Sequence, residues 1–197
     1  VYVHNLKPLT PLGADMPRID TLNGLTITER TDRALASVAA RNGHGHATRE
    51  AATVFLGFAL ADVGQRAGNA TFSAWWMGPD LWMVDAPHET HENLAHDLKA
   101  AVGASASVAE QTDGWCRFDL SGPLCAAVFE RLCNIDIRAT TAGDALRTSI
   151  DHLGCFVLCV EAGTDYAVLG PRSSAGSLHH ALLAAAKSVV VTGDENL

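Results

Sequence analysis

The stretch FSAWWMGPDLWMVDAP, residues 72–87, constrains the fold strongly because it holds three of the four tryptophans of the chain. Apolar runs flank a central Gly-Pro-Asp sequence, a combination typical of a tight turn between two strands. We therefore predict a β-hairpin, with Pro87 opening a helix after it. Neighbouring residues on a strand point to opposite faces, so Trp75 and Trp76 cannot share one face of this sheet.

The composition is that of a globular domain, slightly more apolar and less charged than the average soluble domain. Of the 197 residues, 48% are hydrophobic and 18% are charged, whereas an average soluble domain has about 25% charged residues. A chain of this size buries roughly 70% of the surface that its unfolded form exposes, so it can form its own core. The low charge content favours an obligate interface with another chain.

The charge and hydropathy patterns exclude two classes of partner. The formal net charge is −8 and the 14 basic residues are scattered, which argues against a nucleic-acid surface. No window approaches the roughly 18 uninterrupted apolar residues of a membrane span, and residues 1–20 lack the layout of a signal peptide. We expect a cytoplasmic protein; the initial Val leaves open whether the N-terminus is processed.

The cysteines indicate a reducing compartment. The chain has five, an odd number, without a Cys-x-x-Cys pair and with apolar neighbours. We expect buried thiols rather than reactive ones, because a reactive thiol needs an exposed, electropositive setting. Cys116, beside Arg117, comes nearest to that setting.

The chain divides into three segments. Residues 1–25 hold three of the seven prolines and show no periodicity, so we predict an extended N-terminal arm, either disordered or laid on a partner. Residues 26–190 are predicted to form a single pseudo-symmetric α+β domain, and residues 191–197 a C-terminal tail.

Short apolar runs alternate with helical patterns through the predicted domain. Residues 33–41 fit a strand or a helix. The other predicted helices are 47–62, 88–102, 123–133 and 173–188, and the predicted strands are near 71–77, 81–86, 106–111, 115–121, 146–151, 154–161 and 165–170. The class is α+β with a mainly antiparallel sheet.

A weak internal repeat supports this order. Shifting the sequence by 84 residues places 72–102 on 156–186, with Pro87 on Pro171 at two predicted helix starts. We therefore expect two pseudo-repeated βαββ-type halves packed together. The alternative is that any two hairpin–helix units would look this alike.

The histidine-rich stretches do not fit known metal sites. In HETHENLAH, His88 and His91 are three residues apart, whereas the zinc-protease motif needs two His four apart on one helical face. His91 and His96 are five apart and diverge around a helix. His44 and His46 lie in a glycine loop without a third ligand nearby in sequence. We predict no metal site.

Nucleotide and nucleophile motifs are also missing from the sequence. It contains neither GxGxxG, GxxxxGK[ST] nor GxSxG. Ser149, Asp151 and His152 could be drawn as a triad, yet neighbours on a strand point to opposite faces. We therefore predict no catalytic and no cofactor-binding residue in this chain.

Three stretches, in the same order, resemble the gamma subunit of heterotetrameric sarcosine oxidase. WWMGPDLWMV is similar to a Trp-x-Gly-Pro-Asp-x-Trp hairpin of that family. RFDLSGPLCAAVFERLCNIDI, residues 117–137, resembles its strand, Ser-Gly-Pro turn and helix with a final Cys-x-x-Asp run. DYAVLGPRSSAGSLHHALLAAA is similar to its closing strand, Pro-Arg-Ser turn and helix. The resemblance covers residues 70–188 approximately, and the preceding residues match only in layout.

That family is related in fold to the folate-binding domain of the glycine-cleavage T protein and aminomethyltransferases. In those relatives an acidic residue on a central strand holds the pterin. The corresponding position here falls near Gly154 and Cys155, without a carboxylate. A pterin's paired N–H donors need a carboxylate acceptor, so this chain is not expected to bind folate.

The resemblance implies an oxidoreductase complex that oxidatively demethylates sarcosine or a similar N-methyl amine. FAD, FMN, NAD and tetrahydrofolate would belong to the partner subunits, and this chain would pack on the alpha subunit without catalysing a step. Trp75, Trp76 and Trp82 are the candidate partner-interface residues, because aromatic residues are enriched at interface centres. The alternative is a free-standing, folate-dependent aminomethyltransferase-like protein.

Overall fold

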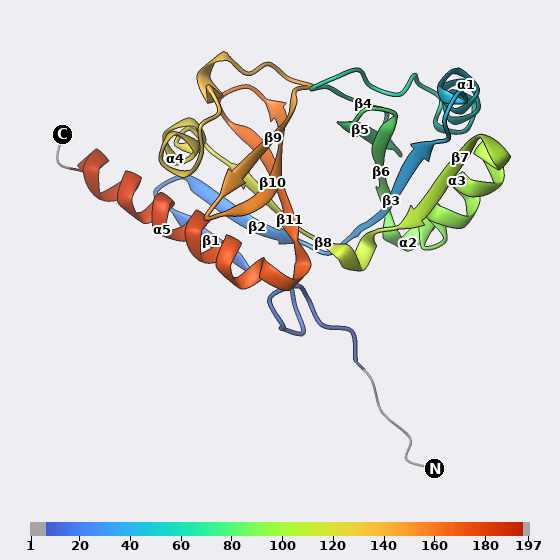
Figure 1. Cartoon of the computed structure of the whole chain (residues 1–197). Helices are drawn as coiled ribbons and strands as arrows, with labels where there is room; N and C mark the ends of the chain where they lie inside the picture. The colour runs from blue at the N-terminus through green and yellow to red at the C-terminus, as the bar shows by residue number, and fades with distance from the viewer. Residues whose placement is uncertain (1–6, 195–197) are drawn as a thin grey trace, which may run out of the picture.

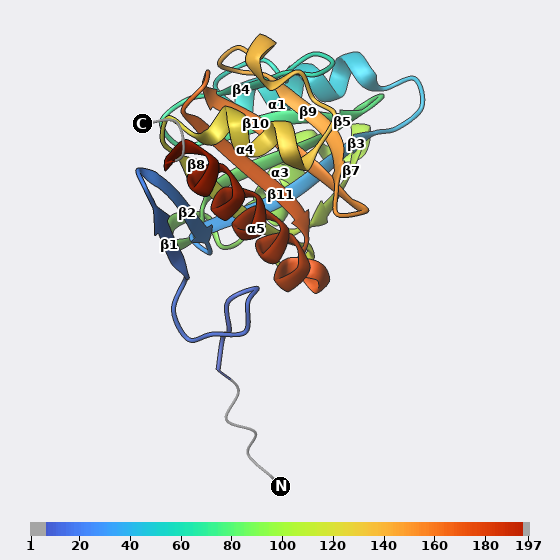
Figure 2. The ribbon, with the colours of Figure 1, turned by 90° about the vertical axis from the view of Figure 1, so that its left-hand side faces the viewer.

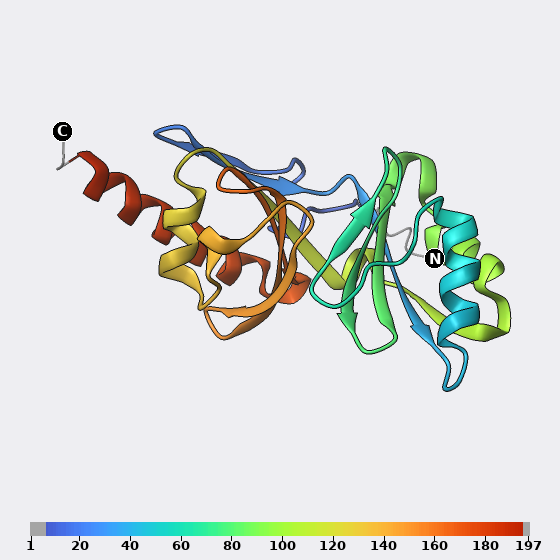
Figure 3. The same ribbon diagram turned by 90° about the horizontal axis from the view of Figure 1, so that it is seen from above.

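The computed structural model describes residues 7–194. Two antiparallel sheets face each other, and helices cover the outer face of each sheet, so the molecule has four layers (Figures 1 and 3). Every strand pair is antiparallel. The predicted α+β class is confirmed.

The first sheet has six strands, in the order β1-β2-β8-β11-β10-β9. Helices α4 and α5 pack on its outer face, and Figure 2 shows α5 crossing that face beside α4. The bounds are β1 Ile19–Leu22, β2 Leu25–Arg30, β8 Trp115–Ser121, β9 Ala145–Ile150, β10 Leu153–Glu161, β11 Asp165–Pro171, α4 Cys125–Leu132 and α5 Ala175–Asp194.

The second sheet has five strands, in the order β4-β5-β6-β3-β7. Helices α1 and α3 pack on its outer face through Ala52, Leu56, Leu94, Leu98 and Val102. The bounds are β3 Arg33–Ala40, β4 Arg66–Gly68, β5 Ser73–Gly78, β6 Leu81–Pro87, β7 Ala106–Glu110, α1 Gly45–Leu56, α2 His88–His91 and α3 Leu94–Val102; short 3-10 turns span Gly103–Ser105, Thr112–Gly114, Ile137–Ala139 and Arg172–Ser174.

The two sheets repeat one topology. Strands β8, β9, β10 and β11 take the places of β3, β4, β5 and β6 in chain order, and β2 from the N-terminal segment takes the place of β7. Strand β6, Leu81–Pro87, coincides with β11, Asp165–Pro171, under the shift of 84 residues, and a helical segment follows each proline. Proline suits this position because its fixed φ fits the entry into a helix. The predicted internal repeat is therefore present in the structure.

Three apolar clusters hold the layers together. One lies between the first sheet and helices α4 and α5, and a second lies between the second sheet and helices α1 and α3. The third lies between the sheets and consists of Leu35, Trp75, Met83, Ala145, Phe156, Leu158, Ala167 and Leu169. Both sheets are thus covered on both faces, which explains their long apolar runs.

One edge of the space between the sheets is closed by backbone pairing. Gln65 and Asp144 form an isolated antiparallel bridge. Around it, the Arg66 N–H donates to the Gly143 carbonyl at 2.7 Å, and the Ala145 N–H donates to the Gly64 carbonyl at 2.8 Å. These bonds connect β4 to β9 and join the two sheets at that edge.

Several predicted elements differ in extent or type. The stretch 33–41, which fitted either element, contains strand β3, Arg33–Ala40. The predicted helix 47–62 ends at Leu56, where Gly57 adopts the left-handed conformation at φ 79°, as is common after a helix end. The predicted helix 88–102 is divided into α2 and α3.

The predicted N-terminal arm contains a strand. Strands β1 and β2 form a hairpin whose turn residues, Asn23 and Gly24, have φ of 40° and 80°. An Asn-Gly pair between alternating apolar residues is a strong hairpin signal, and the sequence reading overlooked it. Residues 1–6 of the arm lie outside the described part of the chain. Residues 191–194, predicted as tail, belong to α5.

Candidate functional site

Trp76 and Trp82 lie opposite each other on the outer face of the β5–β6 hairpin. Trp82 is fully buried, and its Nε1–H donates to the Ala61 carbonyl at 2.8 Å. The guanidinium of Arg49 lies 4.7 Å from the centre of its ring, a favourable cation–π geometry. Trp76 is half-buried against the same apolar cluster.

Trp75 points to the opposite face, as strand alternation predicts, and is also buried, with 1% of its surface exposed. It packs in the cluster between the sheets, near Phe156 and Leu158. The chain's own layers therefore cover both faces of the hairpin. The prediction that Trp75 and Trp82 contact a partner therefore needs correction. Neither indole is accessible, because a sheet covers one face of the hairpin and helices cover the other.

Other partly buried aromatic side chains pack against the same apolar cluster as Trp76. Phe55, Phe58 and Phe72 pack against the same cluster as Trp76, and all four rings are partly exposed. The Phe55 and Phe72 rings are 5.3 Å apart, and the exposed Val54 lies beside Phe55 on α1. We call Val54, Phe55, Phe58, Phe72 and Trp76 the aromatic patch.

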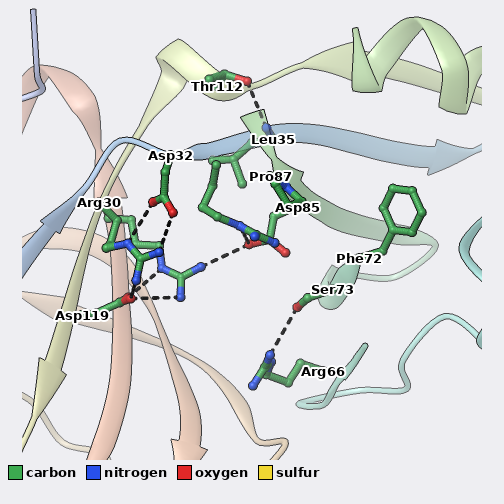
Figure 4. Close-up of polar contacts among 12 residues, drawn as sticks. Arg30, Asp32, Leu35, Arg66, Phe72, Ser73, Asp85, Pro87, Thr112 and Asp119 are labelled. Atoms are coloured by element: carbon green, nitrogen blue, oxygen red, sulfur yellow. Dashed lines mark hydrogen bonds and ion pairs between the residues drawn. The ribbon is translucent and has the colours of Figure 1, made fainter. Parts of the chain in front are cut away.

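Charged side chains gather between the sheets, at the end where β2 passes into β3. This arginine–aspartate network consists of Arg30, Asp32, Arg33, Asp85, Arg117 and Asp119 (Figure 4). Its members come from both sheets: Asp85 from β6 and Arg33 from β3 on one side, and Arg30, Arg117 and Asp119 from β2 and β8 on the other.

Asp85 is at the centre of the network and is buried, with 1% exposed surface. Its Oδ2 accepts hydrogen bonds from Arg33 Nε at 3.0 Å and from Arg117 Nη1 at 3.1 Å. Arg117 also donates from Nε to Asp119 Oδ1 at 2.7 Å. Asp119 Oδ2 accepts from Arg30 Nη1 at 2.9 Å. A continuous chain of charged hydrogen bonds thus crosses from one sheet to the other.

Three buried polar atoms next to this network have no hydrogen-bond partner within the described residues: Arg66 Nε, Trp75 Nε1 and Asp85 Oδ1. Arg66 on β4 lies opposite Trp75 on β5, and its Nη2 is 3.5 Å from Ser73 Oγ. Desolvation by burial lowers the pKa of Arg66. Each of these unpaired buried groups costs free energy of folding. The space between the sheets therefore contains more polar groups than its packing requires.

A cavity of about 400 Å³ opens beside the network. The N-terminal arm forms one wall, with Pro8, Pro11 and Pro17 among its lining residues. The body of the protein forms the other, from which Arg30, Arg33, Leu35, His88, Trp115, Arg117 and Arg172 line the space. The cavity lies on the inward-facing side of β8, where Trp115, Arg117 and Asp119 alternate with core residues.

Two contacts hold the arm over this cavity. The buried carboxylate of Glu29 accepts the backbone N–H of Leu12 at 2.9 Å and that of Arg18 at 3.0 Å. Arg172 Nη2 donates to the Leu9 carbonyl at 2.7 Å. The arm is therefore fixed to the domain at Leu9, Leu12 and Arg18.

The histidines of the two histidine-rich stretches lie apart from one another in the structure. His88 lines the cavity, the ring of His91 packs 4.9 Å from that of Phe72, and His96 is exposed. His46 lies 3.2 Å from Glu50, on the opposite side of α1 from the core. Within the described residues, no three His, Cys, Asp or Glu side chains form a metal-binding group.

The cysteines are free, and four of them are buried. Burial raises the pKa of Cys116 and Cys155 to about 11 and that of Cys125 to about 12. Cys116 therefore stays a thiol at neutral pH despite the adjacent Arg117. Its Sγ donates to the Gly170 carbonyl at 3.5 Å.

No catalytic triad forms from Ser149, Asp151 and His152. Asp151 and His152 are the two turn residues between β9 and β10, with φ of 49° and 64°, and both are exposed, as is Ser149. At the position expected for a pterin-binding carboxylate, Cys155 is buried behind the sheet. The buried carboxylate that faces the space between the sheets is Asp85, which the sequence reading did not single out.

No protein-family model matches the sequence, and no curated protein matches it. Among solved structures, the chain is similar to a chain of the heterotetrameric sarcosine oxidase from Corynebacterium sp. U-96 in complex with pyrrole 2-carboxylate. The TM-score is 0.76 at 22% identity, over 84% of this chain and 85% of that chain.

A second similar structure is the glycine cleavage system aminomethyltransferase T from Bartonella henselae, with a TM-score of 0.56 and 15% identity. It matches over 79% of this chain but over 44% of that chain, so this chain spans less than half of the aminomethyltransferase. The fold thus belongs to the class shared by aminomethyltransferases and a sarcosine oxidase subunit. The likeness to the latter extends over most of both chains.

None of the helices in the described residues has the length and hydropathy to cross a bilayer.

Proposed function

We propose that this chain is a gamma-type subunit of a sarcosine oxidase-like complex that oxidatively demethylates sarcosine or a similar N-methyl amine. Its role is structural: it packs on the alpha subunit of that complex, in the cytoplasm. The observation that carries this proposal is the mutual coverage of 84% and 85% with a chain of a heterotetrameric sarcosine oxidase.

The chemistry of the interior supports a structural role. The charged side chains between the sheets bind one another, and the thiols with raised pKa are poor nucleophiles at neutral pH. FAD, FMN, NAD and tetrahydrofolate are assigned to the partner subunits in this proposal. The strand–helix joints at Pro87 and Pro171 do not fit a dinucleotide in this chain, because they lack the glycine turn that lets a pyrophosphate approach.

The aromatic patch is the proposed contact with the alpha subunit. Trp76 is the one hairpin indole whose ring is partly exposed, and three partly buried phenylalanines and the exposed Val54 add apolar surface on the same outer layer. Partly exposed aromatic clusters are frequent in the central part of interfaces. The partner-interface role predicted for the tryptophans is therefore proposed for Trp76 alone.

Co-expression with flavin-containing oxidase subunits tests the proposal. We expect a stoichiometric complex that oxidises sarcosine or a related amine, and a chain that associates or precipitates when expressed alone. Trp76→Ala should weaken the complex by roughly 2–4 kcal/mol, as truncation of an anchoring aromatic does. Phe118→Leu, in the core of the other sheet, is the control that alters packing without touching the patch.

The alternative is a folate-dependent aminomethyltransferase-like protein. The observation in its favour is Asp85, a buried carboxylate between the sheets, one oxygen of which has no hydrogen-bond partner among residues 7–194. Against it, Asp85 Oδ2 is occupied by Arg33 and Arg117, and the chain spans 44% of the aminomethyltransferase that it resembles. Calorimetry with tetrahydrofolate distinguishes the two functions. We expect no heat of binding to the isolated chain. A saturable heat of binding that Asp85→Asn abolishes would favour the aminomethyltransferase-like function.

A further inference from the structure

We propose that the cavity under the N-terminal arm binds a small carboxylate with a flat apolar body. The cavity has a volume of about 400 Å³, within the range of roughly 300–1,000 Å³ typical of small-molecule sites. This inference goes beyond the proposed subunit role and does not depend on it, because it rests on residues of this chain alone.

Guanidinium groups with unused donors provide the recognition of the carboxylate. Arg33 donates to Asp85 through Nε, and its Nη1 and Nη2 have no partner within the described part of the chain. Arg172 uses Nη2 on the Leu9 carbonyl. Its ion-pair partner, Asp113, is 3.6 Å away with 87% of the side chain exposed, so solvent screens that pair. Arginine's planar fork is suited to bind carboxylates through two N–H groups.

The charge of the lining is positive although the chain is acidic overall. Four arginines line the cavity, against two aspartates, Asp15 and Asp113, that are both exposed to solvent. Arg30 and Arg117 are neutralised from behind by Asp32, Asp85 and Asp119. The donors left for a ligand are therefore those of Arg33 and Arg172. Because Asp32, Asp85 and Asp119 balance the arginines from behind, recognition of a carboxylate rests on the free N–H donors of Arg33 and Arg172 and not on a local excess of positive charge.

The remaining lining favours a flat apolar body over a small inorganic anion. Trp115 and Leu35 belong to the apolar cluster between the sheets or pack against it, and both line the cavity together with the three prolines of the arm. The Trp115 ring is supported from behind by Phe156, at 5.8 Å between ring centres. A rigid indole and proline rings offer flat surfaces against which a ring stacks.

Titration of the full chain with benzoate tests this assignment, using the complex where the chain is obtained only with its partners. We expect saturable binding by calorimetry, and a change in tryptophan fluorescence that Trp115→Phe removes. Arg172→Gln should weaken binding at least about tenfold, and Arg172→Lys less. Arg41→Gln, an exposed arginine at the end of β3 and outside the cavity, should leave it unchanged.

Benzamide and inorganic phosphate are the matched probes. Benzamide has the same ring without the charge, and phosphate has charge without the ring; both should bind at least about tenfold more weakly than benzoate. Equal binding of benzoate and benzamide, or of benzoate to Arg172→Gln and wild type, would overturn the proposal. If Arg172→Gln does not fold by circular dichroism, Arg33→Lys gives the same decision, because it keeps the charge and removes the fork.

Discussion

Arg117 on β8 and Asp85 on β6 lie 3.1 Å apart, from Nη1 to Oδ2, and belong to different sheets. This pair joins the two halves of the repeat through buried charged side chains. Arg33 binds the same oxygen from β3, so removing the carboxylate leaves two guanidinium groups facing each other. The network is therefore expected to stabilise the contact between the two halves of the repeat.

Replacing Asp85 with Asn should destabilise the protein by about 3 kcal/mol, because breaking a buried ion pair leaves an uncompensated buried charge. Urea unfolding monitored by circular dichroism measures this change. Asp32→Asn is the matched control, since 57% of the Asp32 side chain is exposed and its loss should cost no more than about 1 kcal/mol. Equal effects of the two substitutions would contradict a central role for Asp85.

The two buried tryptophans of the hairpin should respond differently to Phe. Trp82→Phe removes a hydrogen bond to the Ala61 carbonyl, whereas Trp75 Nε1 has no partner within the described chain. We expect Trp82→Phe to cost about 1 kcal/mol more in unfolding free energy than Trp75→Phe. The reverse order in denaturant titrations would show that the indole N–H of Trp75 is satisfied in solution.

Much of the fold follows from local pattern. The hairpin at 72–87, the two proline helix starts and the 84-residue shift are all visible in sequence, because alternation and turn residues are local signals. The arginine–aspartate network is not, since the bonds that close it join residues 32 to 89 positions apart along the chain. Each appears as an ordinary polar residue on a strand until the sheets face each other.

The burial of the hairpin tryptophans could also not be predicted without the structure. Strand alternation placed Trp75 and Trp76 on opposite faces, but it could not show that both faces of the sheet are covered. That depends on the second half of the chain, which supplies Phe156 and Leu158 to the inner face.

Gly122 sits where β8 ends, at φ 128°, and an added Cβ would lie 2.1 Å from the Gly24 carbonyl oxygen. Gly122→Ala should therefore cost more than about 2 kcal/mol. Gly163, at φ 86° with open space around it, is the control: Gly163→Ala carries the backbone strain without the clash and should cost about 1 kcal/mol. Similar losses of unfolding free energy would mean that the β1–β2 hairpin moves freely away from Gly122.

Alkaline pH should destabilise the fold through the buried thiols. Cys116, Cys125 and Cys155 have pKa values raised from the ordinary 9.0 to about 11, 12 and 11. The folded state thus holds protons that the unfolded state loses, so their contribution is complete below pH 9 and is lost as pH rises towards 12. Cys125→Ala should flatten this decline in unfolding free energy, and an unchanged slope between pH 9 and 11 would contradict the assignment.

Acid should loosen the β1–β2 hairpin from α5. Asp20 accepts a hydrogen bond from Arg18 and lies 2.8 Å from His179 Nε2, and these partners lower the pKa of Asp20, Arg18 most of all. A lowered pKa means that the stabilisation is present above the ordinary value of 3.8 and is lost as pH falls through the folded-state pKa. Hydrogen exchange in β1 should rise in Asp20→Asn at neutral pH and stay unchanged in Asp15→Asn.

Purification of the chain from its own cells, at native expression level and followed by native mass spectrometry, tests the central proposal most directly. The account predicts a stoichiometric assembly with flavin-containing chains, which oxidises sarcosine or a related N-methyl amine and loses this subunit in Trp76→Ala. A stable monomer that binds no other chain, with amine oxidation unaffected by its deletion, would contradict it.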